Sequence, residues 1–195
     1  MSVGNKIYNS SLELKNINSL AGIAMLLALR VVLGFFANTT LAMFGGTIKI
    51  SGAFLPIAAA GVIFGPVPAA LVGGLGDIIS FLISPTGFYF PGVTINGILT
   101  GLIYGLFFYK NSITIRKTIA AWFLNTLTVE TFIMALWLFI LQIISGAGEV
   151  EKTYFVYLTA RFISQAVKCV PEIILIFAIG RLVARIKLPQ KKRIK

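Results

Sequence analysis

Histidine is absent from this chain of 195 residues, and Cys169 is its single cysteine. A disulfide framework and a metal site built from Cys and His are therefore excluded within one chain. The chain also lacks the G-x-x-x-x-G-K-[ST] loop of P-loop ATPases, and no serine has an evident base beside it. These absences predict a protein that is not an enzyme and that uses no metal and no cofactor.

Charged residues are scarce. They make up 12% of the chain, against about a quarter in soluble domains, while 57% of the residues are hydrophobic and the mean hydropathy is +0.93. This composition predicts an integral protein of the cell membrane, with the lipid bilayer around it. The length suits one compact bundle, so we expect a single membrane-embedded domain over residues 1–195, with a tail at about 187–195. Residues 1–19 are polar and do not resemble a removable signal peptide.

Among the charged residues, acidic ones are the fewer. The chain has six Asp and Glu and 17 Lys and Arg, which gives a net charge of +11. In a soluble protein such an excess would indicate nucleic acid as a partner. Here the cations cluster in alternate loops and tails, and that pattern sets the orientation of a membrane protein. We therefore expect no nucleic-acid partner.

Apolar segments alternate with polar or Gly/Pro-rich breaks along the chain, which predicts an all-α integral membrane protein, a bundle of six transmembrane helices. The expected spans are Leu20–Ala37, Gly52–Phe64, Val67–Ile83, Gly92–Tyr109, Ile119–Ile144 and Tyr154–Ile186. The second is short, and Gly65, Pro66 and Pro68 predict a tight break after it. Gly97, Gly101 and Gly105 recur every four residues in the fourth span, a spacing that permits close helix contact.

Six spans put both termini on one side of the membrane. Lys49 and Lys152 are expected on the other side. The cations expected on the side of the termini are Lys6, Lys15, Lys110, Arg116, Lys117, Arg181, Arg185, Lys187, Lys191, Lys192, Arg193 and Lys195. The positive-inside rule therefore predicts that both termini are cytoplasmic.

The last span carries a polar stripe. Arg161, Gln165, Lys168 and Glu172 are spaced by four, three and four residues, so a helix places them on one face. A charged side chain facing lipid costs at least about 2.5 kcal/mol. The stripe is therefore expected to face protein or a watery cavity.

Polar groups of the other spans converge on the outer half of the bundle. At a rise of about 1.5 Å per residue, Arg30, Asp77 and Trp137 lie about 10 Å below the outer ends of their spans, and Asn96 lies near the end of its span. Arg161 is expected near the outer surface and Lys168 deeper. Single pairs, such as Arg30 with Asp77 or Lys168 with Glu130 or Glu172, fit structural ion pairs equally well.

The whole set exceeds what such pairs require, and favours an outward-facing site for a polar, partly aromatic, anionic small molecule. The loops at 38–51 and 84–91 would cover it. Trp137 and the aromatic run Phe88-Tyr89-Phe90 fit either interfacial side chains or a stacking surface for a flat ring.

Two segments resemble a known family. Ala24-Met-Leu-Leu-Ala28, followed by Leu29-Arg30-Val-Val-Leu-Gly34, resembles the first helix of the substrate-binding (S) components of energy-coupling-factor (ECF) vitamin transporters, and Ala24 and Ala28 match their A-x-x-x-A motif. The run Tyr89-Phe-Pro-Gly92-Val-Thr94-Ile-Asn96-Gly97, continuing through Gly101 and Tyr104-Gly105, resembles the folate-specific branch. The resemblance covers residues 19–187.

The resemblance implies a protein that binds a vitamin, here folate, from outside the cell. It implies partners as well: a transmembrane T subunit that carries two cytoplasmic ATPases. Ala24 and Ala28 would form the docking surface for the T subunit, and residues 38–51 would be a lid. Another vitamin, such as pantothenate or a pyrimidine precursor, remains open. A stand-alone channel or membrane enzyme is a further alternative, although neither pore-lining repeats nor a nucleophile is evident.

For folate, a site needs hydrogen-bonding and aromatic groups for the pterin and cations for the two carboxylates of the glutamate tail. The depth argument assigns Asp77, Asn96 and Trp137 to the pterin, with Tyr89 and Gln165 nearby. It assigns Arg161, helped by Lys49, to the carboxylates. Arg30 and Lys168 fit either the ligand or the ion pairs with Asp77 and Glu130.

Overall fold

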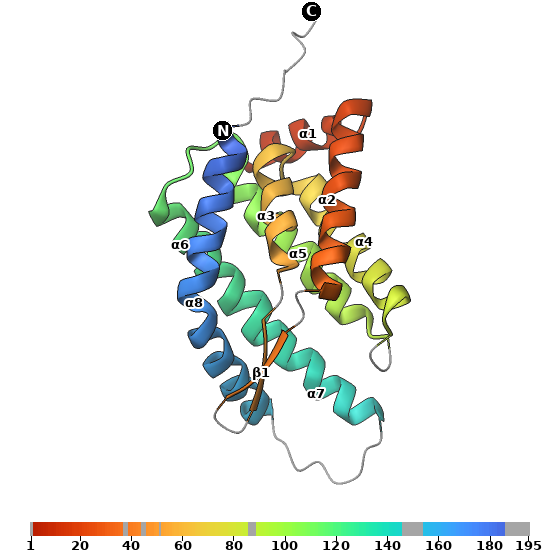
Figure 1. The fold of residues 1–195 in the computed structure, drawn as a ribbon, viewed down its shortest axis with the longest axis vertical. Coiled ribbons are helices and arrows are strands. Elements are labelled where there is room, and N and C mark those ends of the chain that lie inside the picture. The colour runs from red at the N-terminus through yellow and green to blue at the C-terminus, as the bar shows by residue number, and fades with distance from the viewer. Residues whose placement is uncertain are drawn as a thin grey trace, which may run out of the picture.

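The computed structural model describes residues 2–36, 39–43, 46–50, 52–85, 89–145 and 154–185; for residue 36, the two strands and residue 145, only the backbone is described. The elements in chain order are α1 (Val3–Glu13), α2 (Ile17–Phe36), β1 (Thr39–Met43), β2 (Gly46–Ile50), α3 (Phe54–Ile63), α4 (Pro66–Ile83), α5 (Pro91–Phe108), α6 (Ile115–Asn125), the π-helix η1 (Thr126–Ile133), α7 (Met134–Ser145) and α8 (Tyr154–Arg185). The helices form an elongated bundle (Figure 1).

The bundle has the composition of a multi-pass membrane protein. Within the described ranges, four helical segments are long and apolar enough to cross a bilayer, namely Ile17–Phe35, Pro66–Ile83, Pro91–Phe108 and the continuous helix Ile115–Ile144. α3 is apolar but shorter, and α8 is long but carries the polar stripe. The helical membrane fold is thus confirmed, whereas the predicted count of six spans is not established by length and composition.

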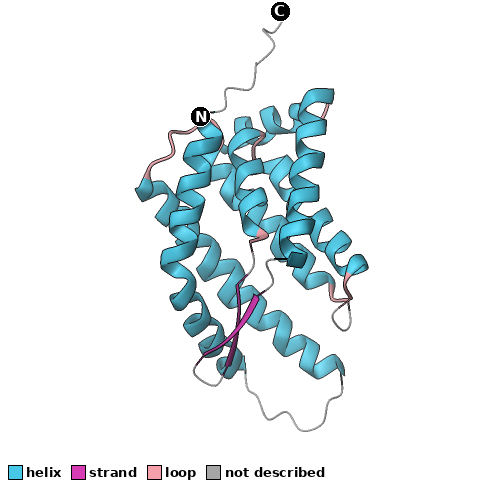
Figure 2. Ribbon diagram, in the orientation of Figure 1, coloured by secondary structure: helices cyan, strands magenta, loops and turns pink. Residues whose placement is uncertain are grey.

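One region departs from the all-α prediction. Residues 38–51 were expected to be a loop, but β1 and β2 pair antiparallel there, with Thr39 opposite Ile50 and Met43 opposite Gly46 (Figure 2). The β-branched residues Thr39, Thr40, Thr47, Ile48 and Ile50 favour this extended backbone. The adjacent glycines Gly45 and Gly46 predict a hinge from the sequence alone, but Gly45 lies outside the described residues, so this stays a prediction.

The glycine pattern of the fourth span is confirmed as a close helix contact. A Cβ at Gly97 would overlap the backbone of Gly73 on α4, and one at Gly101 would lie 2.6 Å from the backbone nitrogen of Ala70. A Cβ at Gly105 would overlap Pro66 at the start of α4. The bare glycines therefore let α4 and α5 pack backbone against backbone along most of their length.

α1 is a helix that the composition did not predict. It lies at the end of the bundle opposite the hairpin (Figure 1). The Lys6 ammonium donates to the Leu106 carbonyl at 2.7 Å, and Ser10 Oγ donates to the Phe64 carbonyl at 2.9 Å. Ser10 also accepts from the Val67 amide at 3.0 Å. It thus fastens the α3–α4 turn, where Gly65 has a φ of +94°, a conformation that glycine adopts without a steric penalty.

Candidate functional site

Two adjoining cavities lie inside the bundle. The larger has a volume of about 950 Å³ and the smaller about 230 Å³. Asp77, Val93, Met134 and Lys168 line both, so the two spaces meet at these side chains. Together they reach the size at which small-molecule sites are usually found.

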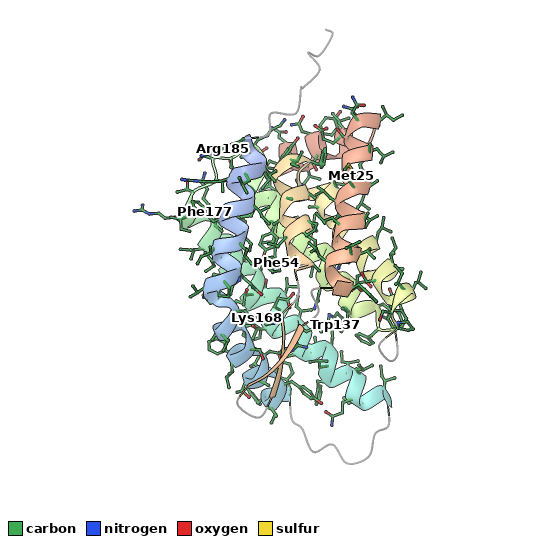
Figure 3. The ribbon with its side chains drawn as sticks, viewed as in Figure 1. Met25, Phe54, Trp137, Lys168, Phe177 and Arg185 are labelled. Atoms are coloured by element: carbon green, nitrogen blue, oxygen red, sulfur yellow. The ribbon has the colours of Figure 1, made fainter. Side chains whose placement is uncertain are left out.

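The polar stripe of α8 faces these cavities, as predicted. Arg161 and Lys168 line the larger cavity, while Gln165, Lys168 and Glu172 line the smaller one. The intervening Phe162, Ile163 and Val170 are exposed on the opposite face of the helix. This part of α8 therefore turns its apolar face outward and the polar stripe inward. In Figure 3, Lys168 lies toward the hairpin end of the helix and Arg185 near the α1 end.

Arg161 and Lys168 lack close counter-ions. Within the described part of the chain, neither has a carboxylate within 4.0 Å, since the ion pair found there joins Arg30 to Asp77. Both cations are partly buried. Two cations that form no direct ion pair among the described residues leave charged donors at the cavity for an anion.

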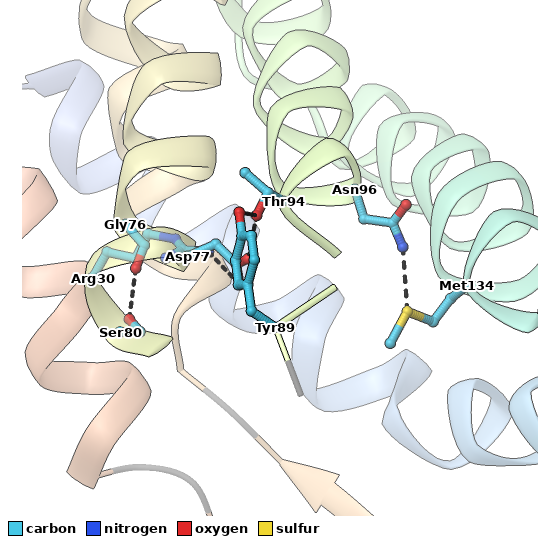
Figure 4. A network of polar contacts seen from close by, with 8 residues as sticks. All are labelled: Arg30, Gly76, Asp77, Ser80, Tyr89, Thr94, Asn96 and Met134. Carbon is cyan, nitrogen blue, oxygen red and sulfur yellow. Dashed lines mark hydrogen bonds and ion pairs between the residues drawn. The ribbon is translucent and has the colours of Figure 1, made fainter. Parts of the chain in front are cut away.

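Arg30 and Asp77 form the ion pair that the sequence left open, with Arg30 Nη2 3.9 Å from Asp77 Oδ1. The Arg30 side chain crosses Gly76, where a Cβ would lie 2.5 Å from it. Asp77 Oδ2 also accepts from Thr94 Oγ1 at 2.8 Å, and the Tyr89 hydroxyl lies 2.9 Å from the same Thr94 oxygen (Figure 4). Asp77 is therefore held in position at the boundary of the two cavities. The buried Arg30 Nε has no hydrogen-bond partner among the described residues.

Asn96 and Trp137 act as a pair. The indole Nε1 of Trp137 donates to Asn96 Oδ1 at 3.1 Å, and Asn96 Nδ2 lies 3.3 Å from Met134 Sδ. Trp137 also packs edge-on against Phe90 at 5.5 Å between ring centroids, over the space left by Gly92. Asn96 lines the smaller cavity, but Trp137 lines neither. Phe90 and Gly92 thus lie against the Trp137 ring, and the indole is linked to the smaller cavity through Asn96.

Acidic and amide groups complete the smaller cavity. Glu130 and Glu172 line it, and Glu172 Oε2 accepts from the Trp122 indole at 2.8 Å. Gln165 is 4% exposed, and its Oε1 has no hydrogen-bond partner among the residues that the structure describes. This oxygen is a buried acceptor that a ligand donor would satisfy.

Several of these features had no signal in the sequence. Glu130 lies on the π-helix η1, an irregularity often found at functional sites but invisible in an apolar pattern. Met134 and Tyr157, which line cavities, read as ordinary membrane residues. Thr94, by contrast, stands inside the quoted run from Tyr89 to Gly97, and its spacing from Tyr89 was a usable signal.

The remaining predicted residues lie elsewhere. For Lys49 only the backbone of β2 is described, so its predicted role stays a prediction. Phe88 lies outside the described residues. Ala24 and Ala28 are exposed on α2, next to the exposed Met25 and Leu29, and line neither cavity.

Comparisons with known proteins agree with this geometry. The sequence model of a family described as ECF-type riboflavin transporter, S component, matches residues 14–181. The folate transporter FolT of Clostridium novyi (strain NT) is 29% identical over 178 residues, which cover 91% of this chain and 96% of that protein. A crystal structure of FolT bound with folic acid has a TM-score of 0.70 and 30% identity, covering 89% of this chain and 94% of that chain.

Proposed function

This chain belongs to the family of ECF-type riboflavin transporter S components, and we propose that the vitamin it binds is folate. The fold is that of a multi-pass membrane protein, and the family is one of transporter subunits rather than enzymes. Both FolT relatives match nearly the full length of the chain, which supports folate over the vitamin in the family's description.

The observation that carries the choice of vitamin is that Arg161 and Lys168 line the larger cavity without a carboxylate within 4.0 Å among the described residues. Folate has two carboxylates on its glutamate tail, whereas riboflavin is uncharged at neutral pH. Charge-assisted hydrogen bonds to carboxylates are among the stronger polar contacts in proteins. A site with two cationic donors that form no direct ion pair among the described residues therefore suits folate better than riboflavin.

In the proposed pose, the pterin enters the smaller cavity and the glutamate tail remains in the larger one. The pterin both donates and accepts hydrogen bonds, and Asp77, Asn96 and Gln165 offer complementary groups. Arg161 lines only the larger cavity and would bind the tail, with Lys168 at the junction. Tyr89 lines the larger cavity, Arg30 orients Asp77, and Trp137 orients Asn96.

The family further supports a division of labour. The S component would bind folate from outside, through six crossings with both termini in the cytoplasm, and dock through Ala24 and Ala28 on a T subunit with two ATPases. The exposed, small side chains of Ala24 and Ala28 leave room for another helix to approach.

Calorimetric titration of the purified protein tests the vitamin. Folate is expected to bind, while riboflavin and pantothenate are not. Mass spectrometry of the small molecule that co-purifies from cells gives an independent answer. Binding of riboflavin without folate would refute the proposed vitamin and leave the transporter class intact.

A further inference from the structure

A cluster of cations lies at the α1 end of the molecule, far from the cavities that would hold the vitamin. We name this set the basic cluster; its members are Lys6, Lys110, Arg116, Lys117, Arg181 and Arg185. Lys110, Arg116 and Lys117 lie before or at the start of α6, and Arg181 and Arg185 lie at the end of α8. Phe177 and Arg185 mark this part of α8 in Figure 3.

A packing contact holds the two halves of the cluster together. Ile113, in the turn before α6, sits against the bare backbone of Gly180, where a Cβ would lie 3.2 Å from its Cδ1. Lys117 Nζ donates to the carbonyl and hydroxyl of Ser112 at 3.3 and 3.2 Å. The Ile113–Gly180 contact therefore brings the segment that holds Ser112 and the Lys117 ammonium against the part of α8 that carries Arg181.

No carboxylate neutralises these charges within the part of the chain that the structure describes. None of the six cations lies within 4.0 Å of an acidic oxygen. Glu13, at the same end, accepts instead from Ser19 Oγ at 2.7 Å. Burial, followed by the charge of Lys117, lowers the pKa of the Lys6 ammonium, so like charges lie close enough to repel one another.

Apolar surface adjoins the cluster. Ile119 and Phe123 on α6 are 45% and 59% exposed, and Leu182 on α8 is 61% exposed. Arg181 extends over the Phe177 ring, with 4.6 Å from its guanidinium carbon to the ring centroid, and Lys110 Nζ lies 5.1 Å from the Tyr109 ring centroid. Long cationic side chains that lie over aromatic rings at the edge of an apolar surface are typical of the lipid–water interface.

We propose that the basic cluster and the exposed apolar side chains of α6 and α8 beside it form a binding site for an anionic phospholipid. The lipid phosphate binds between Lys117 and Arg181, and the acyl chains cover Ile119, Phe123 and Leu182. Basic sites between membrane helices bind acidic head groups in this manner. The apolar surface below the cations favours a lipid over a soluble anion, because a soluble anion would leave that surface uncovered.

Native mass spectrometry and thermal unfolding in neutral detergent test the proposal without reference to the vitamin. Phosphatidylglycerol is expected to remain bound as an adduct and to raise the melting temperature by several degrees more than phosphatidylcholine does. Arg181→Gln and Lys117→Gln should each lose at least half of that difference. Lys15→Gln removes an exposed charge from the same end but outside the cluster, and should retain it.

Three outcomes would overturn the site. Equal stabilisation by the two lipids would show that head-group charge is not recognised. An equal loss in Lys15→Gln would indicate a diffuse charge effect rather than a site. Full stabilisation by glycerol phosphate alone would identify a soluble anion as the occupant. Melting of each variant without added lipid shows whether it folds.

Discussion

Arg161 is the side chain on which the proposed orientation of folate depends. It lines the larger cavity and has no ion pair within the described residues. Arg161→Ala should weaken folate binding by about 1.5–3 kcal/mol, the scale of a hydrogen bond to a charged group, and should hardly affect pteroate, which lacks the glutamate. Calorimetry with both ligands measures the difference, and Arg185→Ala, exposed at the other end of α8, is the matched control. An equal effect on both ligands would place the tail elsewhere.

Trp137 is expected to act through its indole N–H. Trp137→Phe removes the donor to Asn96 Oδ1 and leaves an acceptor unsatisfied on a residue that is only 5% exposed. A buried unsatisfied acceptor costs about 1–3 kcal/mol, so folate and pteroate should lose affinity equally. Trp137→Ala, which also removes the contact with Phe90, should weaken both ligands further. If Trp137→Phe binds normally and only Trp137→Ala fails, the ring rather than the N–H matters.

At the level of single residues, the sequence predicted the depth of a side chain along its helix better than its direction around the helix. Spacing on a helix assigned Arg161, Gln165 and Lys168 to one face, and the cavities adjoin that face. Depth along the axis also brought Arg30 near Asp77. Depth does not state which way a side chain points around its helix. Depth therefore did not predict that Trp137 contacts Phe90 and Asn96, and its role at the ligand stays a prediction.

The α4–α5 contact is the element whose packing is easiest to test. Gly101→Ala would push a Cβ into the Ala69 carbonyl, where backbone atoms cannot yield. Overpacking of this kind costs about 1–3 kcal/mol, which should appear as a lower melting temperature in detergent. Gly4→Ala on α1, where a Cβ would meet nothing within 4 Å, is the control and should leave stability unchanged or slightly raised. Equal melting temperatures of the two variants would contradict the close contact.

The exposed face of α2 is the element proposed for docking. Ala24→Leu and Ala28→Leu should leave folate affinity unchanged, because neither residue lines a cavity, but should reduce folate uptake by crowding the approach of a partner helix. Uptake by cells and binding by purified protein are compared. Ala120→Leu, at an exposed alanine on α6, should preserve both. Parallel loss of binding and uptake would instead assign Ala24 and Ala28 to internal packing.

Elements were predictable where a single chemical pattern dominated. Long apolar runs located α2, α4, α5 and the helix from α6 to α7, and Gly65 with Pro66 located the break after α3. Three elements had weaker signals. α1 is short and polar, the hairpin is short and rich in threonine, and η1 differs from an α-helix only in its hydrogen-bond spacing.

At the scale of the whole molecule, charge asymmetry predicts how the protein sits in the membrane. In Figure 1, α1 and the end of α8 lie at the same end of the bundle. These segments, with the turn before α6 and its first residues, carry Lys6, Lys110, Lys117 and Arg185. That end should be cytoplasmic. In a Cys169→Ser background, a cysteine placed next to Lys195 should resist a membrane-impermeant thiol reagent in intact cells and react after lysis. Labelling in intact cells would reverse the orientation.

The glycine contact between α4 and α5 has a mechanical consequence for ligand entry. Helices that meet through long side chains can slide by small shear steps because rotamers adapt. Two backbones in direct contact at Gly73–Gly97 and Ala69–Gly101 lack that freedom. Asp77, Thr94 and Asn96 all stand on this pair, so their mutual distances are preset before a ligand arrives. We therefore expect any rearrangement on binding in elements outside this pair, such as α8, which carries Arg161 and Lys168.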